Sequence, residues 1–184
     1  MGQHTANSTF ALRTAEGQQV PMQSWTTATW PDGSLKWTGH ALAPDAPSAD
    51  LYEIFPGKPS LPSKPVCVEK TVNAIIVDTG AIHCQLPLNG ESLIDTIKRG
   101  DSTILRHGHL TGMRQDSPDR GAKVEVFSSR IDAVFVEQSG PVRAVIKVTG
   151  THQTEAGRHW LPFSMRLYFH AGSEGIRMTH TFVF

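Results

Sequence analysis

The last third of the chain alternates apolar and polar side chains one by one. In "GPVRAVIKVTG", Arg143, Lys147 and Thr149 fall on one side of an extended backbone. The opposite side carries Val142, Ala144, Ile146 and Val148. "PFSMRLYFHAG" repeats the scheme with Phe163, Met165, Leu167 and Phe169, and "GIRMTHTFVF" continues it with Ile176, Met178, His180 and Phe182. A period of two with one apolar face predicts neighbouring antiparallel strands that are buried on one side.

Two earlier segments have the pattern of β-hairpins. "NAIIVDTGAIHCQLPL" turns at Asp78-Thr79-Gly80, and "LIDTIKRGDSTIL" turns near Gly100-Asp101. Both place short apolar runs on either side of turn-forming residues. No segment has the spacing of a long helix, so the sequence predicts an all-β protein.

Proline recurs between residues 44 and 65, in "APDAPSAD" and "FPGKPSLPSKP". Because proline cannot donate a hydrogen bond to a β-ladder, this stretch interrupts the sheets. We therefore expect a domain division near residue 65. A small first domain, residues 1–65, would pack on a second domain, residues 66–184.

Charge and hydropathy argue against two classes of partner. The chain has 17 basic and 17 acidic residues, a formal net charge of zero, and no run rich in Lys or Arg. Nucleic acids and anionic membrane surfaces attract basic patches, so neither partner is predicted. No apolar stretch approaches the length of a membrane span, and the start "MGQHTANSTF" lacks the pattern of a secretion signal.

Cys67 and Cys84 both lie in strand-like segments. We favour two buried free thiols, because a buried cysteine behaves as a small hydrophobic residue, and a single disulfide remains the alternative. The sequence has no Cys-x-x-Cys pair of the kind that binds zinc.

A third hairpin carries two tryptophans around a tight corner. "TWPDGSLKW" spans residues 29–37, with Trp30 and Trp37 on either side of a Pro-Asp-Gly turn. Gly33 supplies the positive φ that such a turn requires. Large aromatic side chains dominate small cores, so we expect both indoles to cover the core of the first domain.

The segment around this hairpin, "VPMQSWTTATWPDGSLKWTGHAL", resembles the start of the rhamnogalacturonan exolyase-like (PcRGLX/YetA-like) family. The segments "VDTGAIHCQLP", "VEQSGPVRAVIKVTG" and "LPFSMRLYFHAGSEGIRMTHTFVF" resemble the same family in the same order. The resemblance implies a small RIFT-type barrel, then a galactose-mutarotase-like antiparallel β-sandwich, then a large α/α toroid. Because "THTFVF" ends the chain within an apolar strand, we expect an incomplete sandwich and a missing toroid.

The resemblance implies a polysaccharide lyase that cleaves rhamnogalacturonan-type acidic polysaccharide by β-elimination. Such an enzyme neutralises a uronate carboxylate, removes the adjacent proton with a base and protonates the leaving oxygen with an acid. No cofactor is identifiable, although a divalent cation such as calcium could serve the parent protein. The implied partners are an acidic polysaccharide or oligosaccharide and the missing toroid, and the implied location is extracellular or periplasmic. The fragment alone is expected to be inactive.

The polar faces of the last strands supply the first candidate residues. Arg143, Arg166 and Arg177 are candidates for binding an anionic sugar, and Tyr168 and His170 are candidates for acid–base catalysis. The alternative is a solvated sheet face or a docking surface for the toroid.

Other candidates lie outside those strands. Trp30 would bind substrate if its indole stacks on a sugar ring. In "RHGHL", His107 and His109 would point the same way on a strand and could act as a base. A third metal ligand is not identifiable, so the pair predicts no metal site, and an exposed loop is the alternative. His83 and His180 are expected to be hydrogen-bonded core residues.

Two hypotheses follow for the function. The chain is either the N-terminal part of a polysaccharide lyase, or a non-catalytic β module that binds carbohydrate or supports a partner domain. Fold similarity alone does not identify the substrate.

Overall fold

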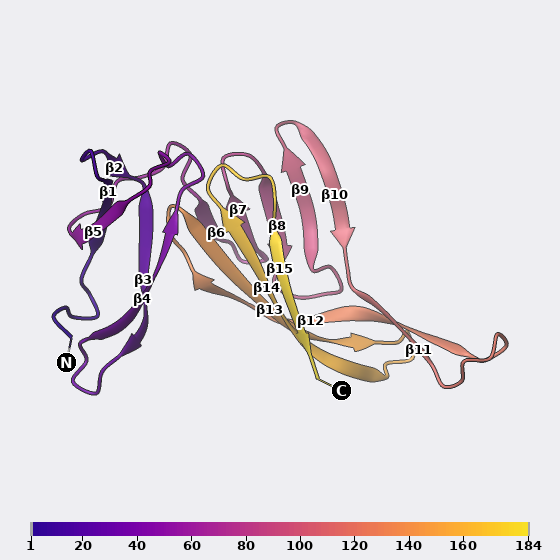
Figure 1. Cartoon of the computed structure of the whole chain (residues 1–184). Helices are drawn as coiled ribbons and strands as arrows, with labels where there is room; N and C mark the ends of the chain where they lie inside the picture. Colours follow the sequence, from indigo (N-terminus) through magenta and orange to yellow (C-terminus); the bar gives the residue numbers. More distant parts are fainter. Residues whose placement is uncertain (1, 184) are drawn as a thin grey trace.

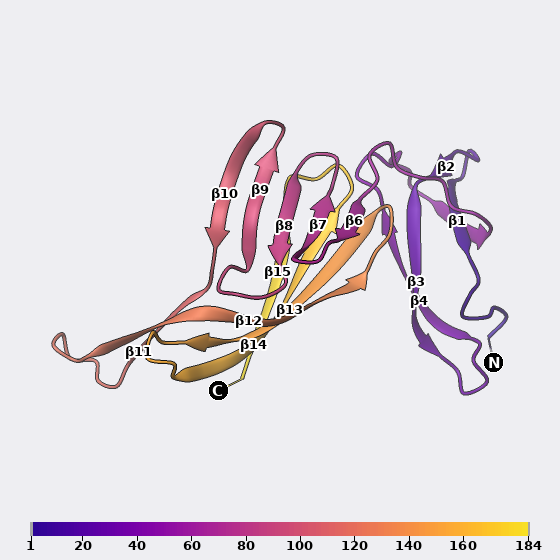
Figure 2. The ribbon, with the colours of Figure 1, turned by 180° about the vertical axis from the view of Figure 1, so that it is seen from behind.

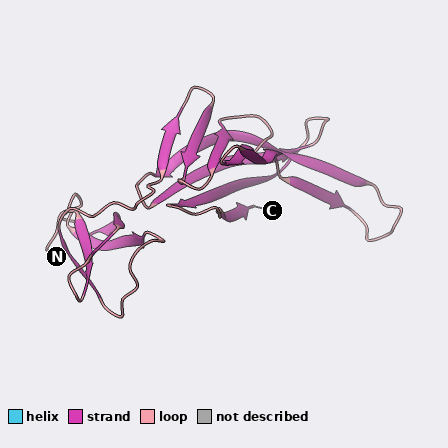
Figure 3. Cartoon of the chain, turned by 90° about the horizontal axis from the view of Figure 1, so that it is seen from above, coloured by secondary structure: helices cyan, strands magenta, loops and turns pink. Residues whose placement is uncertain are grey.

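A computed structural model describes residues 2–183, which form fifteen β-strands and no helix (Figures 1 and 3). The prediction of an all-β protein is therefore confirmed. None of the described residues belongs to a helix that could cross a membrane.

The N-terminal barrel is built from the first five strands, which lie together at one end of the molecule in Figure 1. They are β1 (Phe10–Thr14), β2 (Gln19–Val20), β3 (Met22–Thr29), β4 (Leu35–Leu42) and β5 (Tyr52–Pro56). β1 pairs with β2 and β5, and β3 pairs with β4 in a separate two-stranded ribbon. The small core between them contains Phe10, Leu12, Val20 and Met22.

The first sheet of the sandwich follows. It contains β6 (Cys67–Lys70), β7 (Ala74–Asp78), β8 (His83–Pro87), β9 (Ile94–Arg99) and β10 (Ser102–Gly108). These strands lie in the order β10-β9-β8-β7-β6, so consecutive strands are neighbours. Both predicted hairpins are confirmed, since β7 pairs with β8 and β9 pairs with β10.

The second sheet packs on the first. It contains β11 (Thr111–Gln115), β12 (Val124–Gln138), β13 (Arg143–Gln153), β14 (His159–His170) and β15 (Arg177–Phe182), in chain order. Figure 1 views the sandwich from the side of this sheet, and Figure 2 views it from the side of β6–β10. The apolar faces of both sheets meet in one core cluster.

The predicted strand faces are confirmed for β13 and β14. Every residue predicted to be apolar and inward is at most 4% exposed, namely Val142, Ala144, Ile146, Val148, Phe163, Met165, Leu167 and Phe169. β15 differs because it forms the edge of the sheet, where Met178 and Phe182 remain 57% and 44% exposed. The period of two identified the strand but not its place at an edge.

The prediction that Trp30 and Trp37 cover the barrel core is wrong. Their side chains are 39% and 65% exposed, because smaller residues from β1, β2 and β3 already fill the core. The turn itself forms as expected: the Gly33 amide donates to the Trp30 carbonyl, and Gly33 has a φ of +80°.

The expectation of core histidines also fails. His83 alternates with the buried residues Ile82 and Cys84, so its side chain points outward and is exposed. His180 lies on the edge strand, where its exposed ring contacts the rings of His152 and Phe163.

Both cysteines are free thiols, and the disulfide alternative is excluded. Cys84 is buried as expected, whereas Cys67 is exposed near the start of the edge strand β6. Burial raises the pKa of the Cys84 thiol to about 12.

Thiol labelling tests this arrangement. The reactive species is the thiolate, so at neutral pH we expect one fast-reacting thiol, Cys67, and a second that reacts only in denaturant, Cys84. A Cys67→Ser variant should show no fast labelling by an aromatic disulfide reagent. Two equally fast thiols in the native protein would contradict the burial of Cys84.

Candidate functional site

Four of the residues predicted to form a site lie together on the outer face of the second sheet. β13 and β14 pair Arg143 with His170, and β14 and β15 pair Tyr168 with Arg177. Each of the four alternates with residues directed into the core, so all project from the same outer face. The sheet register thus brings together two cations, a phenol and an imidazole.

Aromatic rings hold the two guanidinium groups of this cluster. The Arg143 guanidinium carbon lies 4.4 Å from the ring centroid of Trp25 and 5.5 Å from that of Tyr168. The Arg177 guanidinium carbon lies 5.6 Å from the Tyr168 centroid. Cation–π contacts orient a guanidinium group and leave its N–H donors free for an anion.

Neither arginine of this pair forms an ion pair within residues 2–183. The Arg143 Nε donates to the neutral Gln138 Oε1 at 2.9 Å. The cluster formed by Arg143, Tyr168, His170 and Arg177, hereafter the Arg143–Arg177 cluster, therefore carries positive charge that no neighbouring carboxylate neutralises. Such a surface suits an anionic ligand.

The barrel positions Arg143 through Gln23 on β3. The Gln23 Oε1 accepts hydrogen bonds from the backbone N–H groups of Val142 and Arg143, at 3.1 and 2.8 Å. Gln23 is only 8% exposed, and it packs so closely on Gly140 that a Cβ there would lie 2.3 Å from the Gln23 Cδ. The two domains are thereby joined beside the cluster.

His170 is poised to accept a proton. Partial burial, and then the positive charges of Arg143 and Arg177, lower the pKa of His170 below its ordinary value of 6.5. The imidazole is therefore neutral at pH 7 and can act as a base.

Arg166 shares the same outer face but has a different environment. Its Nε and Nη2 atoms donate to the two carboxylate oxygens of Glu137, at 2.6 and 2.9 Å. Lys147 also approaches Glu137, at 4.0 Å. Because Glu137 neutralises part of the positive charge of Arg166 and Lys147, Arg166 is a weaker candidate for anion binding than Arg143 or Arg177.

His107 and His109 do not join the cluster, because His107 lies near the end of β10 in the other sheet and His109 follows directly after that strand. His107 contacts the Asp95 carboxylate at 3.1 Å, and both histidines are exposed. A φ of +50° at His107 interrupts the extended backbone, so the expected alignment of the two side chains on a strand fails. No group of three or more potential metal ligands occurs among residues 2–183.

Trp30 also lies apart from the cluster, at the turn of the β3–β4 ribbon. The Nζ atom of Lys36 lies 4.6 Å from the centroid of its ring. Sequence reasoning missed Trp25 and Gln23, although both lie in the segment "VPMQSW" that precedes the hairpin. The signal that could have identified them was an indole and an amide placed just before a well-defined turn.

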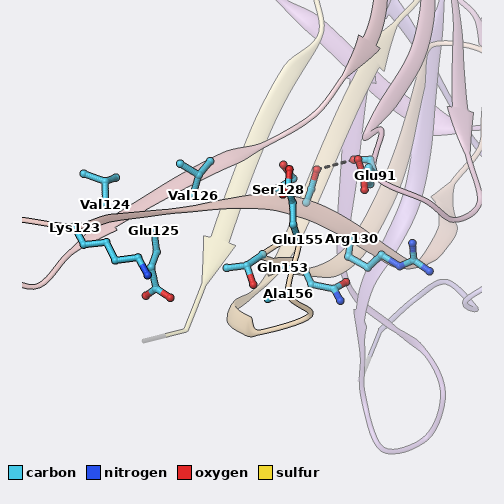
Figure 4. Close-up of a pocket in the computed structure, with 12 residues that line it drawn as sticks. Glu91, Lys123, Val124, Glu125, Val126, Ser128, Arg130, Gln153, Glu155 and Ala156 are labelled. Atoms are coloured by element: carbon cyan, nitrogen blue, oxygen red, sulfur yellow. Dashed lines mark hydrogen bonds between the residues drawn. The ribbon is translucent and has the colours of Figure 1, made fainter.

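A separate open groove of about 750 Å³ lies along the start of β12 and the β13–β14 connection (Figure 4). Its lining mixes Glu91, Lys123, Arg130 and Glu155 with the carboxylate of Glu125, which accepts bonds from Arg158 at 2.6 and 2.8 Å. The dashed bond in Figure 4 joins Ser129 Oγ to the Glu91 carbonyl at 2.7 Å. None of the residues predicted to form a site lines this groove.

Replacing Gln23 by Leu tests the contact between the barrel and the sandwich. The Val142 amide would lose its buried acceptor, which costs about 1–3 kcal/mol of stability. We expect a lower urea midpoint for Gln23→Leu, whereas Gln18→Leu at an exposed barrel position should change it little. Equal midpoints for the two variants would argue against a structural role for the Gln23 amide.

Comparison with known proteins supports the two-domain architecture. Residues 1–57 match the model of the PcRGLX-like N-terminal RIFT barrel domain, and residues 66–184 match that of the PcRGLX-like protein central beta sandwich domain. The uncharacterized protein YetA of Bacillus subtilis (strain 168) is 32% identical over 177 residues, which cover 94% of this chain and 21% of that protein. The chain thus spans about a fifth of the length of this relative. With its barrel, its sandwich and this relative in agreement, the chain belongs to the PcRGLX-like family.

Proposed function

We propose that this chain is the N-terminal, non-toroid part of a polysaccharide lyase that cleaves rhamnogalacturonan-type acidic polysaccharide by β-elimination. The observation that carries the proposal is the pair of guanidinium groups, Arg143 and Arg177, that flank Tyr168 without a carboxylate partner. Membership of the PcRGLX-like family supports the same reading.

The substrate carboxylate is the natural partner of these two cations. A guanidinium group binds a carboxylate through parallel N–H donors, and two such groups withdraw charge from it. The neighbouring C5–H bond of the uronic acid becomes more acidic as a result. The same cations stabilise the negative charge that develops when that proton leaves.

His170 and Tyr168 supply the remaining proton chemistry in this proposal. The neutral His170 imidazole takes the C5 proton, the electron pair forms the C4–C5 double bond, and the C4–O bond breaks. The Tyr168 hydroxyl protonates the departing oxygen. The reaction therefore yields one unsaturated uronic product and one sugar with a free hydroxyl, and it consumes no water.

The rest of the active site belongs, in this proposal, to a C-terminal α/α toroid that follows the sandwich. The outer face of the second sheet then forms one wall of the cleft. A divalent cation such as calcium would assist the arginines in neutralising the carboxylate. Acidic plant polysaccharide occurs outside the cytoplasm, so an extracellular or periplasmic location accompanies the proposal.

The full protein that contains this chain provides the test. Incubated with rhamnogalacturonan, it should release products with the ultraviolet absorbance of an unsaturated uronic acid, and Arg143→Gln should lower kcat/KM about 100-fold or more. Arg106→Gln, an exposed change on β10, should leave kcat/KM unchanged. New reducing ends without absorbance would indicate a hydrolase, and binding without cleavage would indicate a non-catalytic carbohydrate module. Residues 1–184 alone should be inactive.

The pH dependence gives a second test. Since the base must be unprotonated, activity should fall as the pH drops through the pKa of His170, below 6.5. The positive charge of Arg177 disfavours the imidazolium, so Arg177→Gln should raise the pKa of His170 and move the acid limb to higher pH. Nuclear magnetic resonance of the His170 ring reports the same shift without activity. A shift to lower pH in either measurement would contradict the assignment.

A further inference from the structure

Trp37 is an exposed indole on the same ribbon face as the residues that hold the Arg143–Arg177 cluster. Trp37 and Gly39 are two residues apart on β4, so their side-chain positions share one face, about 7 Å apart along the strand. The Trp25 ring covers Gly39, where an added Cβ would lie 2.4 Å from its Cε2 atom. Trp37 therefore follows Trp25 along this face.

The face leads directly to the charged cluster. Trp25 stacks on the Arg143 guanidinium, and Arg143 in turn lies over Tyr168. Trp25, Arg143, Tyr168 and Arg177 thus form a continuous series from the barrel ribbon to the edge of the second sheet, and Trp37 lies on the same ribbon face beyond Trp25. One end of the series is charged, and the other is aromatic and neutral.

The Trp37 indole packs little against the described chain. It is 65% exposed, lies outside the barrel core, and makes no ring or cation contact within residues 2–183. Tryptophan is enriched at binding interfaces, because its ring offers a large apolar surface to a partner. An indole offers a flat ring with a negative face, which attracts the C–H bonds of a pyranose ring.

We propose that Trp37 is a stacking platform for a neutral sugar ring of an acidic polysaccharide whose uronate carboxylate is held by Arg143 and Arg177. The assignment rests on the proposed function and extends it to a second subsite on the barrel. The two unpaired guanidinium groups select an anionic polymer, and the uncharged indole of Trp37 suits a neutral residue of the same polymer. The barrel then contributes to substrate length specificity.

Trp30 is the matched control within the same hairpin. The Nζ atom of Lys36 lies over its ring, 4.6 Å from the centroid, so one face of this indole is already covered by a cation. Trp30 also lies in the turn of the ribbon, outside both paired strands. Its ring is also less exposed, at 39%.

Binding to the full protein that contains this chain, measured by calorimetry, tests the proposal. The probes are a rhamnogalacturonan oligosaccharide of alternating uronic acid and neutral sugar, and monomeric galacturonic acid as its competitor. Trp37→Ala should weaken oligosaccharide binding about tenfold, a loss of about 1.4 kcal/mol, and leave competition by galacturonic acid unchanged. Trp37→Phe should restore part of the affinity, and Trp30→Ala should bind as the unmodified protein does.

The outcomes separate this proposal from the lyase activity. Unchanged oligosaccharide affinity in Trp37→Ala, or an equal loss in Trp30→Ala, would overturn the subsite even if the unmodified protein releases unsaturated products. A selective loss in Trp37→Ala from a protein that releases no such products would support the subsite and overturn the lyase. Failure of Trp37→Phe to recover any affinity would also count against ring stacking.

Discussion

The arrangement of this chain depends on one buried amide oxygen. Gln23 on the barrel accepts two backbone N–H groups from the sandwich, and its side chain leaves no room for a Cβ at Gly140. Without this acceptor the Val142 amide would be buried and unpaired, which is costly in a low-dielectric interior. Because the same contact fixes the backbone of Arg143, the junction between the domains also orients the principal cation of the candidate site.

The outer face of the second sheet shows how context decides the role of like residues. Arg143, Arg166 and Arg177 all project from this face, yet only Arg166 meets a carboxylate, that of Glu137 on β12, two strands away in the sheet. Arg143 and Arg177 instead lie over aromatic rings, which orient a cation without cancelling its charge. The remaining positive charge suits an anionic ligand. Partial burial, and then this charge, lowers the pKa of the neighbouring His170.

Sequence patterns were reliable where one interaction dominates. Burial of every second side chain of β13 and β14 follows directly from the pleat of a sheet, so their faces were predicted correctly. The pattern failed for His83, Trp30, Trp37 and His180, each of which was expected in a core on the strength of apolar neighbours or aromatic character. The apolar character of a side chain allows it to fill a core. Whether it does so depends on whether other residues already occupy that core.

By itself the sequence determined the all-β class, the two early hairpins of the sandwich, the inward faces of its last long strands and the resemblance to one family. These properties are local, since turn residues and a period of two act over a few positions. Only the tertiary structure decided that Trp25 and Gln23 meet Arg143, that Arg166 is paired, and that His107 lies in the other sheet. The contacts of Arg143 with Trp25 and Gln23 join residues more than a hundred positions apart, and the Arg166–Glu137 pair reaches across an intervening strand. No periodicity within a single segment can specify such contacts.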